Sequence, residues 1–505
     1  MEKKFAIIDL GSNSVRMIIM KIDQDHSYRM IDEAKEMVRL SEGMGREMIL
    51  KPTPIKRTIK ALKLFKKLLE VHHVDEVFLV ATAAVRNAIN QKEFLQIVYT
   101  ETGFEFEVIT GEKEGYYAYL GVINTIDINE CVIIDVGGGS TELVLVENRQ
   151  IKEAISFPFG AVILTEGYLD RKQESTEKMK QLEEYIAKQF KKVDWLKKAV
   201  GLPVVGIGGT ARTLAKINKN EIEFPLTSLH NYQITSKEMI AAFNKVSKAK
   251  IHERKNIPGV NKERADIIVG GIVPIKCLVE YLKADKLIIS GNGLREGVFF
   301  EKYILECYPV NRLLKDVLHH SINNVLRNYD ANIIHSYHIR KLALSIFDQM
   351  TDLHGLGKEE RKLLSAAALL HDIGNYVDYY NHQKHGFYLV LNSRLNGLRN
   401  RELVMCAFIV AMHREVDFRR DWKSYSMLIS KKDFEIIIKL SIFLNIAEKL
   451  DRSEARIIED VECLIEGERV QIKVKSATSP ELEICTAYKV QKAFKKAFNR
   501  DLEII

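Results

Sequence analysis

The N-terminal part of the chain alternates short apolar runs with amphipathic stretches, a pattern typical of an α/β fold. Between Ile55 and His72, apolar residues recur at the spacing of one helix face. Candidate strands lie on both sides of this helix and cover residues 5–12, 16–23, 76–82 and 104–111. We therefore expect this region to form a sheet with helices packed on it.

The same pattern starts again at Cys131, where an apolar run, a Gly-rich turn and a second apolar run follow one another. A charged amphipathic helix is expected over residues 174–200. Two further strands that lead into glycines are expected within 202–210 and 286–297. This order predicts a second α/β lobe.

After Tyr308 the pattern changes to long amphipathic segments, which predict a helical domain over residues 311–455. In the tail we expect a basic helix at 490–498 and three strands at 461–467, 469–476 and 480–487. The patterns divide the chain into four expected domains with the ranges 1–127, 128–305, 306–457 and 458–505.

An internal repeat links the two α/β lobes. The segment from Asp9 to Arg16 aligns with the segment from Asp135 to Glu142. In both, an apolar strand ends in Asp, the sequence x-Gly-x-x-Ser follows, and a second apolar strand comes next. Two copies of one strand–turn–strand unit indicate two related lobes that face each other.

The repeated turns have the composition of an anion site. Glycine lets the backbone approach a ligand closely, and the N–H groups and hydroxyls of such a turn bind phosphate. Two ordinary hairpins would have the same composition, but the duplication, with an acid at the same place in both copies, favours phosphate binding. The candidate binding residues are Gly11, Ser12, Asn13, Ser14, Arg16, Gly137, Gly138, Gly139, Ser140 and Thr141, and a third turn adds Gly208, Gly209 and Thr210.

Composition narrows the class of protein. The chain has 505 residues, which is too long for a single hydrophobic core. It is 46% hydrophobic, which argues against a disordered chain. No apolar run reaches the roughly 18 residues of a membrane span, and the N-terminus reads as a strand rather than a cleavable signal. Six scattered cysteines without CxxC spacing favour a reduced, cytoplasmic compartment. The net charge of +7 suits a polyanionic ligand without requiring one.

The two Asp-x-Gly turns resemble those of the acetate and sugar kinase, Hsp70 and actin superfamily. Within it, the chain is most similar to the Ppx/GppA family of exopolyphosphatases and guanosine pentaphosphate phosphatases. Further segments resemble that family in its own order, namely Ala81–Ala88, Ile109–Glu114, Phe157–Val162, Val205–Thr210 and Gly293–Gly297. The resemblance implies two ribonuclease-H-like (actin/sugar-kinase-like) lobes over about residues 1–305.

The resemblance also implies roles for residues. It places the family's catalytic glutamate at Glu114, as the general base for the attacking water, while Lys113 stands where the family has another Glu. By itself, Glu114 would be read as an acid that complements a helix N-terminus. Arg86 is expected to bind the phosphoryl oxygens and Asp135 to act beside it. The expected Mg²⁺ ligands are Asp9, Asp135 and Glu142.

The helical domain carries a second set of candidate ligands. Its motifs at 370–374 and 447–453 resemble the HD phosphohydrolase superfamily, which implies an all-α HD-like domain followed by a small α+β C-terminal segment. The expected metal ligands are His338, His371, Asp372 and Asp451, with His385 and His413 as further candidates. Arg414 follows His413 where two-metal relatives have another His, which argues against a binuclear site. The domain is either a second metal-dependent centre or a relic that lengthens a substrate channel.

A loose basic cluster lies in the same domain. It consists of Arg399, Arg401, Arg414, Arg419, Arg420 and Lys423. Such a cluster would guide a linear polyanion by long-range attraction, and a solvated surface is the alternative.

The resemblance, with which the residue patterns agree, implies a Mg²⁺-dependent exopolyphosphatase that removes terminal phosphates from inorganic polyphosphate processively by direct water attack. The alternative substrate is guanosine pentaphosphate, since the same loops serve both. Two other classes stay open: a kinase that holds ATP at residues 205–210, and a non-catalytic alarmone sensor. No aromatic-interleaved motif points to a specific nucleic acid, and no membrane partner is expected. The family resemblance implies a homodimer.

Overall fold

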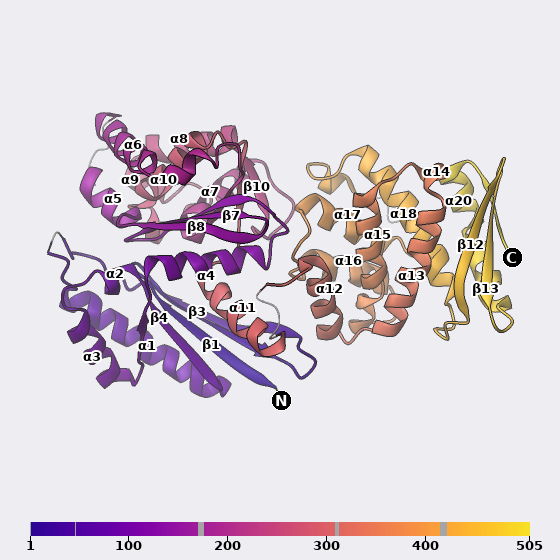
Figure 1. Ribbon diagram of the computed structural model, residues 1–505, viewed down its shortest axis with the longest axis horizontal. Coiled ribbons are helices and arrows are strands. Elements are labelled where there is room, and N and C mark those ends of the chain that lie inside the picture. Colours follow the sequence, from indigo (N-terminus) through magenta and orange to yellow (C-terminus); the bar gives the residue numbers. More distant parts are fainter. Residues whose placement is uncertain (1, 46, 170–175, 309–312, 415–421) are drawn as a thin grey trace. The chain divides into compact units, whose positions relative to one another are not determined.

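The computed structural model describes residues 2–45, 47–169, 176–308, 313–414 and 422–505. These residues form two compact units, Met1–Lys315 and Asp316–Ile505 (Figure 1). The boundary lies beyond the expected limit at residue 305, because that limit falls inside helix α11 (Leu294–Cys307). Helix α11 packs against strand β1 (Lys3–Leu10) and helix α4 (Gly111–Ile123), so it belongs to the first unit.

The first lobe of unit 1 is built on a five-stranded sheet in the order β3-β2-β1-β4-β5. Strands β1, β2 and β3 pair antiparallel, and β4 and β5 continue the sheet in parallel. The predicted helix at 55–72 is α1, and most of the predicted strand at 104–111 is irregular because only β5 pairs. The remaining elements are β2 (Val15–Ile22), β3 (Tyr28–Glu36), α1 (Pro52–His72), β4 (Glu76–Ala81), α2 (Ala83–Arg86), α3 (Gln91–Thr102) and β5 (Glu107–Val108).

The second lobe repeats this topology. Its sheet has the order β8-β7-β6-β9-β11-β10, again with two antiparallel hairpins followed by parallel strands, and β10 forms an antiparallel edge. The sequence repeat is therefore also a repeat of fold, and unit 1 consists of two ribonuclease-H-like lobes. The elements are β6 (Cys131–Val136), β7 (Thr141–Glu147), β8 (Gln150–Phe157), α5 (Ala161–Tyr168), α6 (Thr176–Lys191), β9 (Val204–Ile207), α7 (Gly208–Glu221), β10 (Tyr232–Thr235), α8 (Ser236–Lys248), α9 (Ile251–Arg254), α10 (Ile268–Tyr281) and β11 (Lys286–Ile289).

Helix α4 lies between the two sheets and joins a hydrophobic core shared by both lobes (Figure 1). Its residue Leu120 is buried in one cluster with Ile7 of the first sheet and Ile133 of the second. Helix α11 crosses α4 at close distance: a Cβ added at Gly297 would lie 1.8 Å from the Tyr117 carbonyl oxygen. Only glycine permits this approach of two backbones.

Unit 2 combines helices with a three-stranded sheet in the order β12-β13-β14, and α13 packs on β12, so the helices and this sheet form one compact unit. The predicted strand at 480–487 is wrong. That segment is helix α19, whose first turn carries Glu481 and Glu483, which complement the helix dipole. The third strand is β14, which pairs in parallel with β13. The elements are α12 (Val317–Asn328), α13 (Ile333–Gln349), α14 (Thr351–His354), α15 (Lys358–Leu370), α16 (His382–Asn392), α17 (Asn400–Ala411), α18 (Lys431–Leu450), β12 (Ile458–Glu466), β13 (Arg469–Ser476), α19 (Glu481–Ala487), α20 (Gln491–Phe498) and β14 (Asp501–Ile504).

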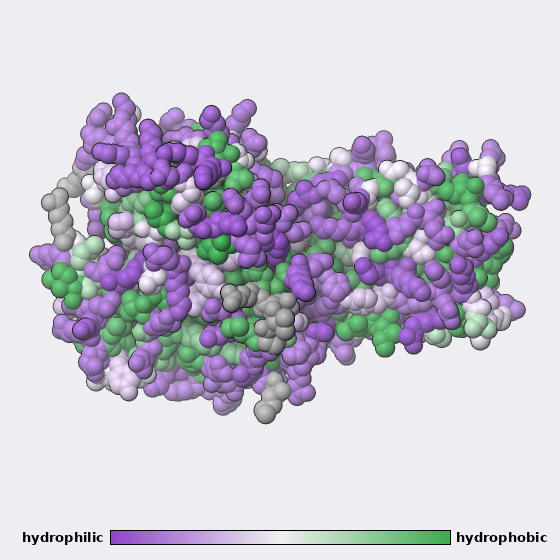
Figure 2. Space-filling view, viewed as in Figure 1, coloured by the Kyte–Doolittle hydropathy of each residue, from purple (hydrophilic) through white to green (hydrophobic). Residues whose placement is uncertain are grey.

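The surface of the chain is mostly polar. Figure 2 shows hydrophilic side chains over most of the visible face of each unit, with hydrophobic residues in small separate patches. Among the described residues, every helix is too short or too polar to cross a bilayer.

Candidate active site

The two repeated turns form matching hairpins. In the first lobe Asp9 pairs with Arg16 across strands β1 and β2, and in the second lobe Asp135 pairs with Glu142 across β6 and β7. In both, the N–H of the first glycine closes the turn on the serine three residues later, at 3.2 Å in the first lobe and 3.0 Å in the second. The sequence repeat is thus also a repeat of strand register and turn geometry.

The tips of the two hairpins lie against each other and line one cleft between the lobes. A Cβ added at Gly138 would lie 2.9 Å from the Ser12 Cβ, and one added at Gly139 would lie 3.0 Å from the Ser12 Oγ. Side chains larger than hydrogen at these positions would separate the hairpins. The composition of the second turn therefore follows from its contact with the first.

The third glycine turn brings further groups to the cleft. Gly208 has a φ of +77°, and a Cβ there would lie 2.5 Å from the Asp135 Oδ1. A Cβ at Gly209 would overlap the Arg264 guanidinium. The two glycines thus leave room beside the cleft for the Asp135 carboxylate and the Arg264 guanidinium. Thr210 is buried and faces Gly271 of α10, away from the cleft.

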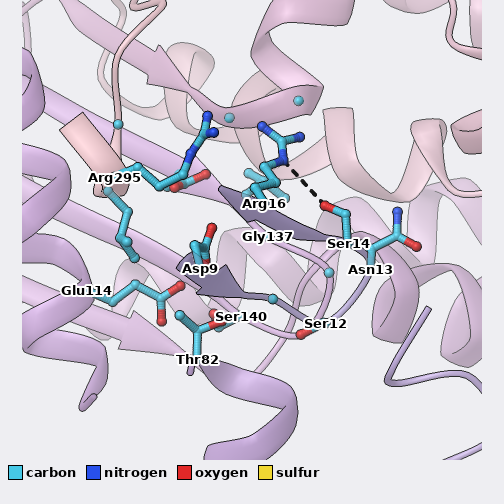
Figure 3. A pocket seen from close by; sticks show the side chains of 18 of the residues that line it. Asp9, Ser12, Asn13, Ser14, Arg16, Thr82, Glu114, Gly137, Ser140 and Arg295 are labelled. Carbon is cyan, nitrogen blue, oxygen red and sulfur yellow. Dashed lines mark hydrogen bonds between the residues drawn. The ribbon is translucent and has the colours of Figure 1, made fainter. Parts of the chain in front are cut away.

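Glu114 stands in the first turn of α4 and lines the same cleft. The helix begins there because the Thr110 side chain accepts the Lys113 N–H at 3.2 Å. Arg86, at the end of α2, donates from Nη1 to the Glu114 Oε2 at 3.1 Å and to the Ile109 carbonyl at 2.9 Å. Figure 3 shows the Glu114 carboxylate directed toward Asp9 and the hairpin tips.

The carboxylates at the cleft carry raised pKa values. Burial, followed by the charge of Glu142, raises the pKa of Glu114 well above its ordinary value, and Arg86 opposes this. Burial and the nearby Asp135 raise the pKa of Glu142 to about 7. Burial and the nearby Asp9 raise the pKa of Asp135 to about 6. A carboxylate with a pKa near neutrality is suited to accept a proton during turnover.

Four arginines gather on one side of the cleft, namely Arg16, Arg212, Arg264 and Arg295. Burial, with Arg212 as the next cause, lowers the pKa of Arg16 to about 9. The Arg264 Nε and the Asn13 Nδ2 are buried donors without a hydrogen-bond partner among the described residues. Crowded cations and unsatisfied donors are stabilised when a polyanion binds between them.

The sequence interpretation omitted three of these arginines. Arg212 follows the third glycine turn and Arg295 lies in the segment 293–297, so both stood next to motifs already recognised. Arg264 comes from a short 3-10 turn with no motif of its own. Thr82, Asn292 and Glu296 also line the cleft.

Some predicted residues lie behind the cleft rather than in its wall. The Thr141 Oγ1 donates to the Phe159 carbonyl at 2.7 Å, which uses its hydroxyl in packing. Glu142 is buried and its Oε1 accepts from the Ser156 Oγ at 2.9 Å. Arg86 reaches the cleft only through Glu114. None of these three residues lines the cleft itself, and Arg86 is the one whose contact described above is with a residue of the wall.

The acids of the cleft fit a magnesium ion. Asp9 and Asp135 both line the cleft, and the buried Glu142 Oε2 has no hydrogen-bond partner among the described residues. Carboxylates alone, with water and phosphate oxygens, are the ligands that Mg²⁺ prefers. Within the described chain, these three acids do not form one tight group of ligands, so one or two of them would bind the ion directly.

The second candidate set is brought together only in part. His371 and Asp372 lie side by side in unit 2, but the buried Asp451 contacts His335, at 2.8 Å, rather than the predicted His338. His338, three residues further along α13, contacts the backbone at Ile458 instead. His335 and His338 lie one helical turn apart. Their distance in the sequence from the His371-Asp372 motif therefore did not show which of the two would bind Asp451.

Further along the chain, His382 rather than His385 faces the cluster, together with His413. The missing histidine after His413 therefore does not exclude a binuclear site, because α16 supplies one.

The predicted basic cluster is largely paired within unit 2. Arg399 contacts Glu359 and Glu402, and Arg401 contacts Asp433. These pairs leave less free charge to guide a polyanion than the sequence indicated. Arg419 and Arg420 lie outside the described residues.

Comparison with known proteins supports the motif-based resemblance. Residues 18–306 match the model of the Ppx/GppA phosphatase family, and residues 317–488 match that of Ppx/GppA phosphatase domain III. A bifunctional 3-dehydroquinate synthase/phosphatase from Fusobacterium nucleatum is 29% identical over 311 residues, which are 59% of this chain and 46% of that protein. The chain thus spans about half the length of this curated relative.

Solved structures agree with the fold of unit 1. A Ppx/GppA family member from Aquifex aeolicus is 34% identical, with a TM-score of 0.53, over 61% of this chain and 99% of that chain. An exopolyphosphatase from Cytophaga hutchinsonii is 22% identical, with a TM-score of 0.56, over 60% of this chain and 98% of that one, and supports the fold alone.

Proposed function

The chain belongs to the Ppx/GppA phosphatase family, and from this premise we propose that it hydrolyses the terminal phosphoanhydride bond of inorganic polyphosphate. The observation that carries the proposal is the buried Glu114 carboxylate in a cleft walled by two opposed glycine–serine hairpins. The four arginines on one side of that cleft support a substrate with charge on several successive phosphates.

In the proposed reaction the hairpins hold the terminal phosphates through backbone N–H groups and the hydroxyls of Ser12 and Ser140. Glu114 accepts a proton from water as the water oxygen attacks the terminal phosphorus and the P–O bond to the shortened chain breaks. Arg86 is a positioning residue that holds Glu114 in place. Asp9 or Asp135 would hold a Mg²⁺ ion, which would supply neutralisation of the phosphate charge.

A phosphate-release assay on polyphosphate tests Glu114. We expect Glu114→Gln to lower kcat by about 10²–10⁴-fold while polyphosphate binding is retained, because the amide keeps the size but cannot take the proton. Glu112→Gln is the matched control, since this acid lies in the same helical turn and is exposed. Equal rates for wild type and Glu114→Gln would contradict the role of the carboxylate.

The same assay separates the alternatives. Faster release of phosphate from guanosine pentaphosphate than from polyphosphate would assign that substrate instead. Tight binding of guanosine tetraphosphate without any phosphate release would support the sensor. Transfer of phosphate from ATP to an added acceptor would support a kinase.

Three finer expectations belong to this proposal. The carboxylate ligands of the cleft support Mg²⁺ over softer ions. The homodimer and the cytoplasmic location rest on the family resemblance and on cysteine usage. Light scattering on the purified chain would test the dimer.

A further inference from the structure

Unit 2 contains a cavity that the proposed hydrolysis does not use. The cavity has a volume of about 390 Å³ and is lined by residues of helices α12, α13 and α15, together with the residue that precedes α12. Helices α12 and α13 both pack against α15 (Figure 1). Pockets that bind small organic molecules measure roughly 300–1,000 Å³, so this cavity has room for one. It shares no residue with the histidine and aspartate set described above.

One part of the cavity wall is apolar. Leu318 and Ile322 come from α12, and Ala366 and Leu369 come from the C-terminal half of α15. Ile322, Ala366 and Leu369 are buried. An apolar group that entered the cavity would therefore leave water and contact hydrocarbon, which is favourable.

The other part of the wall is basic. Lys358, Arg361 and Lys362 share one face of the first two turns of α15, since they stand at the spacing i, i+3 and i+4. Arg340 of α13 also lines the cavity. Among the described residues that line it, Asp316 is the one acid. The wall therefore has an excess of positive charge.

Two of the four cations are paired with acids. Arg361 donates to both carboxylate oxygens of Asp348, each at 2.7 Å. Lys362 lies 3.5 Å from the Glu402 Oε1. These contacts offset the charge of two side chains and leave two cations to consider.

Arg340 and Lys358 have no carboxylate partner among the described residues. The Arg340 Nε donates to the Ser365 hydroxyl at 2.6 Å. This contact fixes the plane of the guanidinium and leaves its two terminal nitrogens for another acceptor. A half-buried guanidinium and an ammonium without an acid are stabilised when an anion binds between them.

The place of the cations in α15 also favours an anion. The N-terminus of a helix carries partial positive charge, so basic side chains in its first turns are unfavourable there. The two acids of the first turn have other contacts: Glu359 pairs with Arg399, and Glu360 accepts the Gly357 N–H at 2.8 Å. Sequences depart from such local rules mainly at functional sites.

We propose that this cavity binds an organic phosphate monoester, with its phosphate at Arg340 and Lys358 and its apolar group against Ile322 and Leu369. A phosphate monoester carries a charge of about −1.5 to −2 at neutral pH, which matches two cations without partners. A carboxylate carries half that charge, and inorganic phosphate has no group for the apolar wall. The site lies outside the cleft of unit 1 and does not depend on the function proposed for it.

Calorimetric titration of the full-length protein with hexyl phosphate tests the site. Hexanoate, inorganic phosphate and 1-hexanol are titrated in parallel, because each lacks one feature of hexyl phosphate. We expect hexyl phosphate to bind at least about ten-fold more tightly than any of the three. Hexanoate of equal affinity would overturn the assignment of the phosphate group. Equal affinity for inorganic phosphate would show that the apolar wall is not used and would overturn the inference.

Variants assign the binding to the cavity. Arg340→Gln and Lys358→Gln should each lower the affinity for hexyl phosphate about ten-fold. Lys341→Gln is the matched control, because this next residue of α13 lies outside the cavity and contacts the Glu459 carbonyl. Ala366→Leu should weaken binding without any change of charge, because the larger side chain fills part of the cavity. Thermal unfolding shows whether each variant is folded.

Hydrogen exchange measured by mass spectrometry locates the bound hexyl phosphate. We expect slower exchange in residues 316–322 and 358–369, both in wild type and in Glu114→Gln. A failure of the cleft chemistry would therefore leave this result unaffected. Protection confined to residues 9–16 and 135–142 of the unit 1 cleft, or an affinity that neither Arg340→Gln nor Lys358→Gln changes, would overturn the proposed site.

Discussion

Three carboxylates beside the cleft, Glu114, Asp135 and Glu142, are packed closely enough to make the site sensitive to pH. Burial raises all three pKa values, and so does a neighbouring acid in each case: Glu142 for Glu114, Asp135 for Glu142, and Asp9 for Asp135. A raised folded-state pKa means that the folded chain holds the proton more tightly than the unfolded chain. Its contribution to stability is therefore complete at acid pH and is lost as the pH rises through the folded-state pKa.

Glu142→Gln tests this at one residue. The amide resembles the protonated acid, so we expect its stability relative to wild type to grow as the pH rises from about 4 to above the folded-state pKa of about 7, by up to about 3 kcal/mol. Urea unfolding at a series of pH values, without Mg²⁺ or phosphate, measures the difference in the free energy of unfolding between Glu142→Gln and wild type. Glu147→Gln, at the far end of the same strand, is the control. A difference between Glu142→Gln and wild type that does not change with pH would refute the electrostatic explanation.

Which site residues could be predicted depended on local sequence. The hairpin residues were predictable because Asp, Gly and Ser recur at the same offsets in both copies, and Glu114 because a family segment contains it. Arg264 was not predictable, since it reaches the cleft only because Gly209 leaves space for its guanidinium. His335 could not be distinguished from His338, because the two lie one turn apart on α13 and helix packing decides which of them reaches Asp451.

At the scale of elements, the crossing of α4 and α11 fixes the position of the helix that carries Glu114. We expect Gly297→Ala to destabilise unit 1 by about 3 kcal/mol or more and to lower phosphate release, because its Cβ would collide with the backbone of α4. Gly167→Ala in α5 is the control, as a Cβ there meets no atom within 4 Å. Thermal unfolding and kcat measured together check both. A Gly297→Ala variant as stable and active as the control would show that the helices separate easily.

The elements themselves were largely predictable where apolar periodicity was strong, as in α1 and the paired hairpins. The segment 480–487 was misread because its alternating apolar residues fit a short strand as well as one helical face. The order of the strands within each sheet required the structure, since β14, rather than this segment, completes the C-terminal sheet.

At the scale of the whole molecule, charge should govern substrate capture. The chain carries a net charge of +7, and four arginines line the cleft. Between about 50 and 200 mM salt, we expect KM for long polyphosphate to rise roughly ten-fold with little change in kcat. Arg264→Ala should flatten this dependence, whereas Arg399→Ala, whose charge is paired with Glu402, should leave it as in wild type. A KM that does not respond to salt would contradict capture by these charges.

The placement of α4 between the two sheets has a consequence for when the enzyme can react. One helix is packed into both halves of unit 1 and carries Glu114, the proposed proton acceptor, in its first turn. If the halves swing apart, this carboxylate cannot keep its distance to both hairpins at once. In the proposed reaction, water activation is therefore tied to the arrangement in which both hairpins face this carboxylate, and a more open arrangement would lack a complete reaction centre.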